Sequence, residues 1–190
     1  EHDKVSGGVT KAVEIGAVIE KTGCRYIDGG IIGGPPKKGY AGPVIYVSGP
    51  DASAARILGE LGLNCKELDA TIGTASALKM CYGGITKGVT AIGTTLALAA
   101  SRAGIADALR QELMTSQAVL YQTLQRSVPD MFGKAYRWVA EMEEISTFVG
   151  KRAEGDVHKA IAGLYDRLAK DYDNQRKEID ALAHFFRKDG

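Results

Sequence analysis

Lys79 is the residue of this sequence whose type and surroundings are best suited to chemistry. It stands in the stretch "TASALKMCYGG", where the two residues on either side of it are uncharged. A lysine in such surroundings is expected to lose hydration, which would allow it to exchange a proton with a substrate near neutral pH. An amphipathic helix whose ammonium reaches into solvent would explain the same stretch, and composition alone favours that simpler interpretation.

The side of the helix that carries Lys79 is expected to be open. Residues three, four and seven positions further on share this side, and they are Tyr82, Gly83 and Thr86. Because Gly83 has no side chain, it would leave a groove beside the ammonium. Tyr82 and Gly83 are therefore candidate substrate-binding residues.

A second unusual stretch is "RYIDGGIIGGPPKKGY", residues 25–40, in which an apolar strand containing Asp28 leads into four glycines. A flexible linker would favour glycine with serine and other polar residues. The pattern instead predicts a site at which something approaches the backbone closely. The glycine spacing matches neither G-x-G-x-x-G nor G-x-x-x-x-G-K-[ST], so the stretch is not itself a nucleotide fingerprint.

The elements that must position these residues change character along the chain. Residues 8–21 show the apolar spacing of a helix, and strands are expected at 25–31, 44–48 and 63–70. Between the last two strands, Asp51 is expected to cap a helix that ends at Gly62. This alternation is typical of half an α/β domain.

The remainder of the chain is predicted to be helical. One long helix over 72–101 carries Gly83, Gly84, Gly88 and Gly93 in its interior. Each costs up to about 1 kcal/mol relative to alanine, so a close approach by a helix or a ligand is expected. A helix from 105 is expected to stop at Pro129, after which Asp130 caps a helix that ends at Gly150. Apolar spacing predicts a single last helix over 157–182.

Charge and cysteine content exclude several classes of protein. The formal net charge is +1, without a polybasic tract, so binding to nucleic acid or to an anionic membrane is not expected. The three cysteines are scattered and lack metal-ligand spacing. The uncharged segment 88–101 is too short to span a bilayer. We expect a cytoplasmic protein without a metal.

Three motifs, "YIDGGIIGGPP", "PVIYVSG" and "IGTASALKMCYGG", occur in the order found in a known superfamily. Over nearly its whole length the chain resembles the 6-phosphogluconate dehydrogenase-like and β-hydroxyacid dehydrogenase superfamily, especially its uncharacterised branch with a helical C-terminal domain. The resemblance implies an α/β fold at residues 1–71, the second half of a Rossmann-type NAD(P)-binding domain. It also implies an all-α C-terminal domain at residues 72–190, which starts with the long interdomain helix.

The resemblance also implies a reaction. Gly33 and Gly34 match the substrate-binding glycine pair of the family, Gly73 matches the glycine that starts the interdomain helix, and Lys79 matches the catalytic lysine. In such enzymes hydride passes between the nicotinamide of NADP or NAD and the carbinol carbon of a hydroxy acid, while the lysine takes or gives the hydroxyl proton. The implied partners are a small hydroxy acid and a second copy of the chain in a homodimer.

Two positions depart from the family pattern. Many relatives have serine immediately before the glycine pair and asparagine four residues after the lysine, where this chain has Ile32 and Gly83. The corresponding hydrogen bonds to the substrate are then either absent or supplied from elsewhere, by Tyr82 or by Lys134 and Arg137.

The family's dinucleotide fingerprint, which belongs to the first βα turn of the fold, does not occur in this sequence. We therefore expect the chain to be part of a longer protein, and half a sheet to have an unpaired edge. The alternative is a non-catalytic helical module for dimerisation or interaction, in which the glycine-rich helix serves close packing and Lys79 is incidental.

Overall fold

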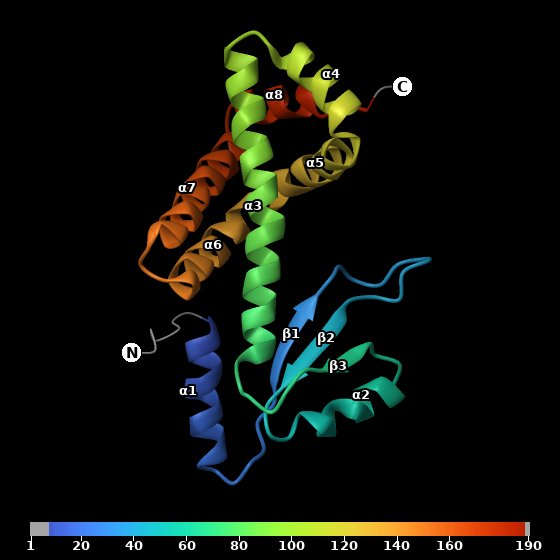
Figure 1. Cartoon of the computed structure of the whole chain (residues 1–190), viewed down its shortest axis with the longest axis vertical. Coiled ribbons are helices and arrows are strands. Elements are labelled where there is room, and N and C mark those ends of the chain that lie inside the picture. The colour runs from blue at the N-terminus through green and yellow to red at the C-terminus, as the bar shows by residue number, and fades with distance from the viewer. Residues whose placement is uncertain (1–7, 189–190) are drawn as a thin grey trace. The chain divides into compact units, whose positions relative to one another are not determined.

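The computed structural model describes residues 8–188, shown in Figure 1. The chain divides into two compact units. The first contains the residues up to Gly84 together with Glu144–Gly155, and the second contains Ile85–Glu143 and the residues from Asp156 onward. Three helices contribute residues to both units: α3 (Thr74–Arg102), α6 (Ala135–Val149) and α7 (Ala153–Asp173).

The first unit contains a sheet of three short strands. They are β1 (Asp28–Ile32), β2 (Val44–Ser48) and β3 (Cys65–Glu67), paired in the order β1-β2-β3. β1 runs antiparallel to β2, whereas β3 runs parallel to it. A tight turn closed by Lys37 and Tyr40 lies in the connection from β1 to β2. Among the described residues, β1 and β3 are the edge strands.

The predicted start of the first strand is wrong by three residues. The sequence suggested a strand over 25–31, but β1 begins at Asp28, which pairs with Ser48 at the end of β2. The chain turns away after Ser48 at Gly49, whose φ of 122° favours glycine. Residues 25–27 therefore have no strand to pair with. Asp28 stands at the beginning of the strand, and the first two glycines lie within it.

Helical segments flank this sheet. α1 (Gly8–Glu20) precedes β1, and a 3-10 turn, η1 (Ala52–Ala55), continues into α2 (Arg56–Glu60) before β3. The buried side chains of Val47, Ala52 and Ala55 form the apolar core between β2 and these turns.

Asp51 stands at the N-cap position of η1, as predicted, but its side chain does not make the expected capping hydrogen bond. The backbone carbonyls of Gly49 and Asp51 already accept from the N–H groups of Ala52 and Ala54, so the start of η1 needs no carboxylate. The Asp51 carboxylate instead lies 3.9 Å from the Arg25 guanidinium.

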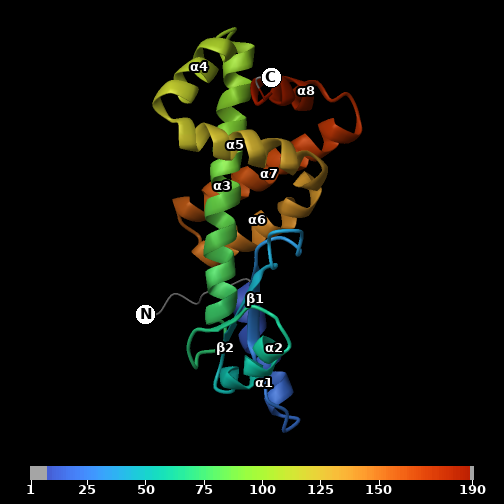
Figure 2. The ribbon, with the colours of Figure 1, turned by 90° about the vertical axis from the view of Figure 1, so that its right-hand side faces the viewer.

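α3 spans 29 residues. Both ribbon views show it as one unbroken helix (Figure 1, Figure 2). The second unit is otherwise built from α4 (Ala106–Ser116), α5 (Ala118–Met131), a 3-10 turn η2 (Phe132–Lys134), α8 (Lys177–Phe185) and most of α6 and α7. Its fully buried side chains include Met131, Met142, Tyr165, Leu168, Ile179, Leu182 and Phe185.

The single helix predicted to end at Pro129 is two helices. The chain leaves helical geometry at Gln117, where φ is −135° and ψ is 44°. α5 then continues past Pro129 to Met131, so Asp130 lies inside α5 and caps nothing. Proline removes one N–H from the helical ladder, but Val128 and Met131 are fully buried, and their packing holds the last turn in place.

The last predicted helix is also divided. α7 ends at Asp173 and α8 begins at Lys177, with Arg176 between them in a left-handed conformation, φ 58°. The Asp171 carboxylate accepts hydrogen bonds from the backbone N–H groups of Lys177, Glu178 and Ile179. These are the N–H groups that a helix start leaves without partners, so Asp171 makes the division stable.

None of the helices in the described part of the chain is both long enough and apolar enough to cross a membrane. Residues 8–188 also contain no group of three His, Cys, Asp or Glu side chains that is arranged to hold a metal ion.

Candidate active site

The start of α3 is held against the sheet by Asp28, whose side chain is buried. Its Oδ2 accepts hydrogen bonds from the backbone N–H groups of Gly73 at 3.1 Å and Ser76 at 3.0 Å. Its Oδ1 accepts one from the Ser76 hydroxyl at 2.7 Å. A carboxylate is favoured here because the first turn of a helix has unpaired N–H groups and a positive dipole end. Asp28 therefore positions the helix that carries Lys79.

Ser48 completes this attachment from the neighbouring strand. Its hydroxyl donates to Asp28 Oδ2 at 3.3 Å and accepts from the backbone N–H of Ala75 at 3.0 Å. The two residues face each other at the paired ends of β1 and β2. The first turn of α3 thus takes its hydrogen-bond partners from both strands.

Gly30 is a position at which the backbone of another element comes close to β1. A Cβ built on Gly30 would lie 2.6 Å from the carbonyl oxygen of Ala75 and 3.4 Å from Cβ of Lys79. Asp28 and Gly30 are both buried and lie two residues apart, so they share the face of β1 that α3 covers. The close approach in this stretch is made by a helix, and it seats the stem of Lys79 directly over β1.

The side chain of Lys79 itself is exposed. Within residues 8–188, it forms no ion pair and no hydrogen bond. The loss of hydration that we expected for Lys79 is therefore not found in this part of the chain, because no described element covers it. Its catalytic role stays a prediction.

Gly33 and Gly34 differ from each other. Gly33 has a φ of 121°, and a Cβ on it would collide with the Tyr40 hydroxyl, so the turn between β1 and β2 by itself requires glycine there. Gly34 has open space around it. Their backbone N–H groups find no acceptor among the described residues. Two free donors stay available for an anion at the end of β1.

The other candidates on the helix are Tyr82, which is half exposed, and Gly83, which is buried. The open groove expected beside Gly83 is therefore not found, because neighbouring residues of this chain cover it.

Lys134 and Arg137 belong to the second unit, where the Lys134 ammonium pairs with the Asp130 carboxylate at 2.7 Å.

A polar cluster that the sequence did not reveal lies in the second unit. The Lys87 ammonium is 2.7 Å from Glu141 Oε1 and 5.3 Å from the centre of the Trp138 ring. The Tyr165 hydroxyl donates to the Lys87 carbonyl at 2.6 Å. Burial, and secondarily the Glu141 carboxylate, raise the pKa of Tyr165 well above its usual value. The charges of Lys87 and Glu141 compensate each other. We therefore interpret the cluster as a structural link between α3, α6 and α7.

Comparison with known proteins identifies relatives for most of the chain. DUF1932, a domain of unknown function, matches residues 100–168. The solved structure of MTH1747, a conserved protein of unknown function described as structurally similar to 3-hydroxyacid dehydrogenases, is 26% identical with a TM-score of 0.71. A conserved hypothetical protein from Sinorhizobium meliloti 1021 is 22% identical, also with a TM-score of 0.71. No curated protein matches.

The chain has a 3-hydroxyacid dehydrogenase-like fold. The superfamily and the fold class predicted from the sequence, a partial Rossmann-type domain followed by an all-α domain, are thereby confirmed. The alignments cover 88% and 94% of this chain but only 64% of each solved relative. The chain thus spans less than two thirds of the length of these relatives.

The start of α3 in this 3-hydroxyacid dehydrogenase-like chain is not available as a dinucleotide site. Phosphates of such cofactors bind at a free helix N-terminus that follows a glycine-rich turn. The N-terminus of α3 is already filled by Asp28 and Ser48, and the glycine-rich stretch leads into a strand connection. No residue in the described part of the chain is therefore assigned to NAD(P).

Sequence reasoning missed the roles of Asp28, Gly30 and Ser48. A signal for the first two was present: Asp28, Gly30 and Ile32 alternate along the strand and so lie on one face. On the buried face of a strand, an acidic residue indicates that a helix start lies nearby, and a glycine indicates that another element packs closely against the strand. No local signal marks Ser48, whose partners are 20 and 27 residues away.

Proposed function

We propose that this chain carries the substrate-binding and proton-transfer part of an NAD(P)-dependent dehydrogenase that acts on a hydroxy acid. The observation that carries the proposal is the position of Lys79. The Asp28 and Ser48 hydrogen bonds hold the start of α3, and Gly30 lets the helix lie directly on β1, so the stem of Lys79 is fixed over this strand. The ammonium at the end of that stem remains free to exchange a proton.

The substrate carboxylate would bind at the end of the same strand. Gly33 and Gly34 lie three and four residues after Gly30, just beyond the end of β1. Their two unpaired N–H groups are suitable donors for a carboxylate. In this proposal Lys79 takes the hydroxyl proton of the substrate, and Tyr82 helps to orient the substrate.

A nicotinamide, NADP or NAD, would accept the hydride in such a reaction. We include a nicotinamide cofactor because this chain is similar to a protein that resembles 3-hydroxyacid dehydrogenases.

Replacement of Lys79 by methionine tests the proposal. Oxidation of short 3-hydroxy acids by the native-length protein is followed as NADH or NADPH absorbance, with both cofactors offered. Because general acid–base catalysis contributes about 10²- to 10⁴-fold, we expect Lys79→Met to lower kcat by that factor with a small change in KM. The matched control is Lys66→Met, at an exposed lysine on β3. Equal turnover of the two variants would refute the role of Lys79.

The exposure of Lys79 and the filled start of α3 favour a second candidate, a non-catalytic interaction module. Under this alternative, none of the hydroxy acids is turned over with either cofactor. Binding then discriminates between the two functions: line broadening in the proton NMR spectrum of a 3-hydroxy acid, abolished by Gly34→Val, supports a substrate site even without turnover. Unchanged spectra support the interaction module.

A further inference from the structure

A polar cavity of about 600 Å³ lies between α5 and the end of the described chain. One wall is a single side of α5, on which Gln122 and Arg126 are one helical turn apart. The other wall is formed by Ala183 of α8 and by residues 186–188, which follow this helix. Both walls belong to the second unit. The cavity is therefore complete within this unit.

Side chains of α4 and α5 hold the second wall in place. The Arg187 carbonyl accepts hydrogen bonds from the Gln125 amide at 2.8 Å and from the guanidinium of Arg110, a buried residue, at 3.4 Å. The Tyr121 hydroxyl donates to the Phe185 carbonyl at 3.2 Å and accepts from Nε of Arg110 at 2.9 Å. The backbone of this wall is thus fixed before any ligand binds, which lowers the cost of binding.

The charge along the cavity is positive and only partly compensated. Arg126, Arg187 and Lys188 line it, and none of the described residues that line it is acidic. The Arg187 guanidinium is 3.3 Å from the Asp107 carboxylate, so this charge already has a partner. Arg126 and Lys188 form no ion pair and no hydrogen bond within residues 8–188. Two cations in one cavity are therefore available to an anion.

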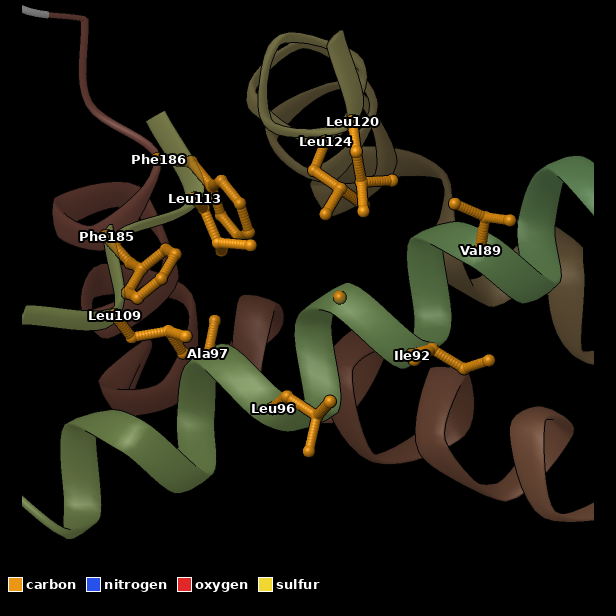
Figure 3. Close-up of a pocket in the computed structure, with 11 residues that line it drawn as sticks. Val89, Ile92, Leu96, Ala97, Leu109, Leu113, Leu120, Leu124, Phe185 and Phe186 are labelled. Atoms are coloured by element: carbon orange, nitrogen blue, oxygen red, sulfur yellow. The ribbon is translucent and has the colours of Figure 1, made fainter. Parts of the chain in front are cut away.

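A second cavity that shares a residue with this one has a different character. Phe186 lines both, and in Figure 3 its ring points into the second cavity, which has about 300 Å³ and is lined only by apolar residues and glycine. No group there can orient a polar ligand. In the polar cavity, Pro129, Ala183 and Phe186 supply apolar contacts beside the cations and amides. Such a mixed lining suits a small organic molecule that carries a charge.

We propose that the polar cavity binds a phosphate monoester of a small organic molecule. A phosphate monoester carries about 1.5 to 2 negative charges at neutral pH, which matches the two unpaired cations. The Arg126 guanidinium can donate two parallel hydrogen bonds to phosphate oxygens, and the Lys188 ammonium adds a point charge. The side-chain amides of Gln122 and Gln125 can exchange hydrogen bonds with hydroxyl groups of the ligand. The cavity is larger than an inorganic phosphate ion, so space remains for the organic part.

Isothermal titration calorimetry on the full chain tests the proposal, with adenosine 5′-phosphate and ribose 5-phosphate as probes. We expect one of them to bind saturably, and adenosine or succinate to bind at least about tenfold more weakly. Arg126→Gln should weaken binding of the phosphate probe at least about tenfold, because it removes charge-assisted hydrogen bonds. The matched control is Arg102→Gln, at an exposed arginine in the last turn of α3. Its variant should bind like the unaltered chain.

A second variant distinguishes a site from general attraction between charges. Ala183→Phe keeps every charge and places a ring in the cavity at an exposed position of α8. Circular dichroism should show an intact fold, while affinity for the phosphate probe falls at least about tenfold. Binding that Arg126→Gln weakens and Ala183→Phe leaves unchanged would be an adventitious surface contact and would overturn the proposal. Failure of both phosphate monoesters to bind, or equally tight binding of succinate, would also overturn it.

Discussion

Asp28 illustrates how one residue can determine the geometry of a candidate site without taking part in its chemistry. Its carboxylate accepts three hydrogen bonds from the first turn of α3 and one from Ser48. Both oxygens are in use, and the side chain is 3% exposed. The acidic residue of the "YIDGG" motif therefore maintains the position of Lys79.

Removal of this carboxylate should destabilise the protein. Asp28→Ala leaves the N–H groups of Gly73 and Ser76 without acceptors in a buried place, so we expect the free energy of unfolding to fall by about 2–4 kcal/mol. Urea denaturation measures this loss. Asp51→Ala is the control: its carboxylate caps nothing and should change stability by less than about 0.5 kcal/mol. Equal losses in the two variants would contradict the role assigned to Asp28.

At the scale of elements, the contact of α3 with β1 decides where Lys79 stands. The helix lies so close to the strand that the Ala75 carbonyl occupies the space of a side chain at position 30. The strand contributes a glycine there, and two residues earlier it contributes the carboxylate that holds the helix start. Strand and helix thus act as one support for the lysine.

The two glycines Gly30 and Gly34 should respond oppositely to alanine. Gly30→Ala pushes α3 away from β1, so we expect a loss of about 1–3 kcal/mol in stability and lower activity through the displaced Lys79. Gly34→Ala meets open space and lacks the positive φ that favours glycine, so the protein should be as stable as before or slightly more so. Thermal unfolding and hydroxy acid turnover are the measurements. A stable, fully active Gly30→Ala variant would show that the close contact is not needed.

At the scale of the whole molecule, four exposed apolar side chains on α3, those of Ile85, Val89, Ile92 and Leu96, would link stability to association in the homodimer that the family resemblance implies. A dimer that forms only from folded chains shifts the unfolding equilibrium by mass action. The apolar residues that are buried in the described part of one chain do not include Ile85, Val89, Ile92 or Leu96. These side chains would be buried only in the pair.

The unfolding temperature should therefore depend on chain concentration. For a folded dimer in equilibrium with unfolded chains, a tenfold rise in concentration should raise Tm by about 1–3 °C. Scanning calorimetry at several concentrations measures this dependence. Ile92→Asp should abolish it, whereas Ile57→Asp, at an equally exposed isoleucine of α2 in the first unit, should retain it. A Tm of the unaltered chain that is independent of concentration would contradict folding-linked dimerisation.

Much of the fold could be predicted from local pattern. β2 was located at its observed bounds, and α1 and the long helix α3 were placed to within one or two residues, because the period of apolar residues marks such elements. The motifs around Lys79 and the glycine pair were sufficient to indicate the superfamily, which the structural comparison confirms. The sequence by itself thus determined the classes of element and the candidate chemistry.

Only the tertiary structure decided which residues are in contact with Asp28, with the glycines and with the helix end at Pro129. Asp28 and the N–H of Gly73 are 45 positions apart, and no local pattern can pair them. The helix predicted to stop at Pro129 continues because Val128 and Met131 are buried, and burial is a property of the assembled core. The sequence indicated that some of the glycines would allow a close approach, which is found at Gly30 and Gly93 but not at Gly34 or Gly88. Whether a ligand, a strand or a helix makes each approach depends on contacts between residues far apart in the chain.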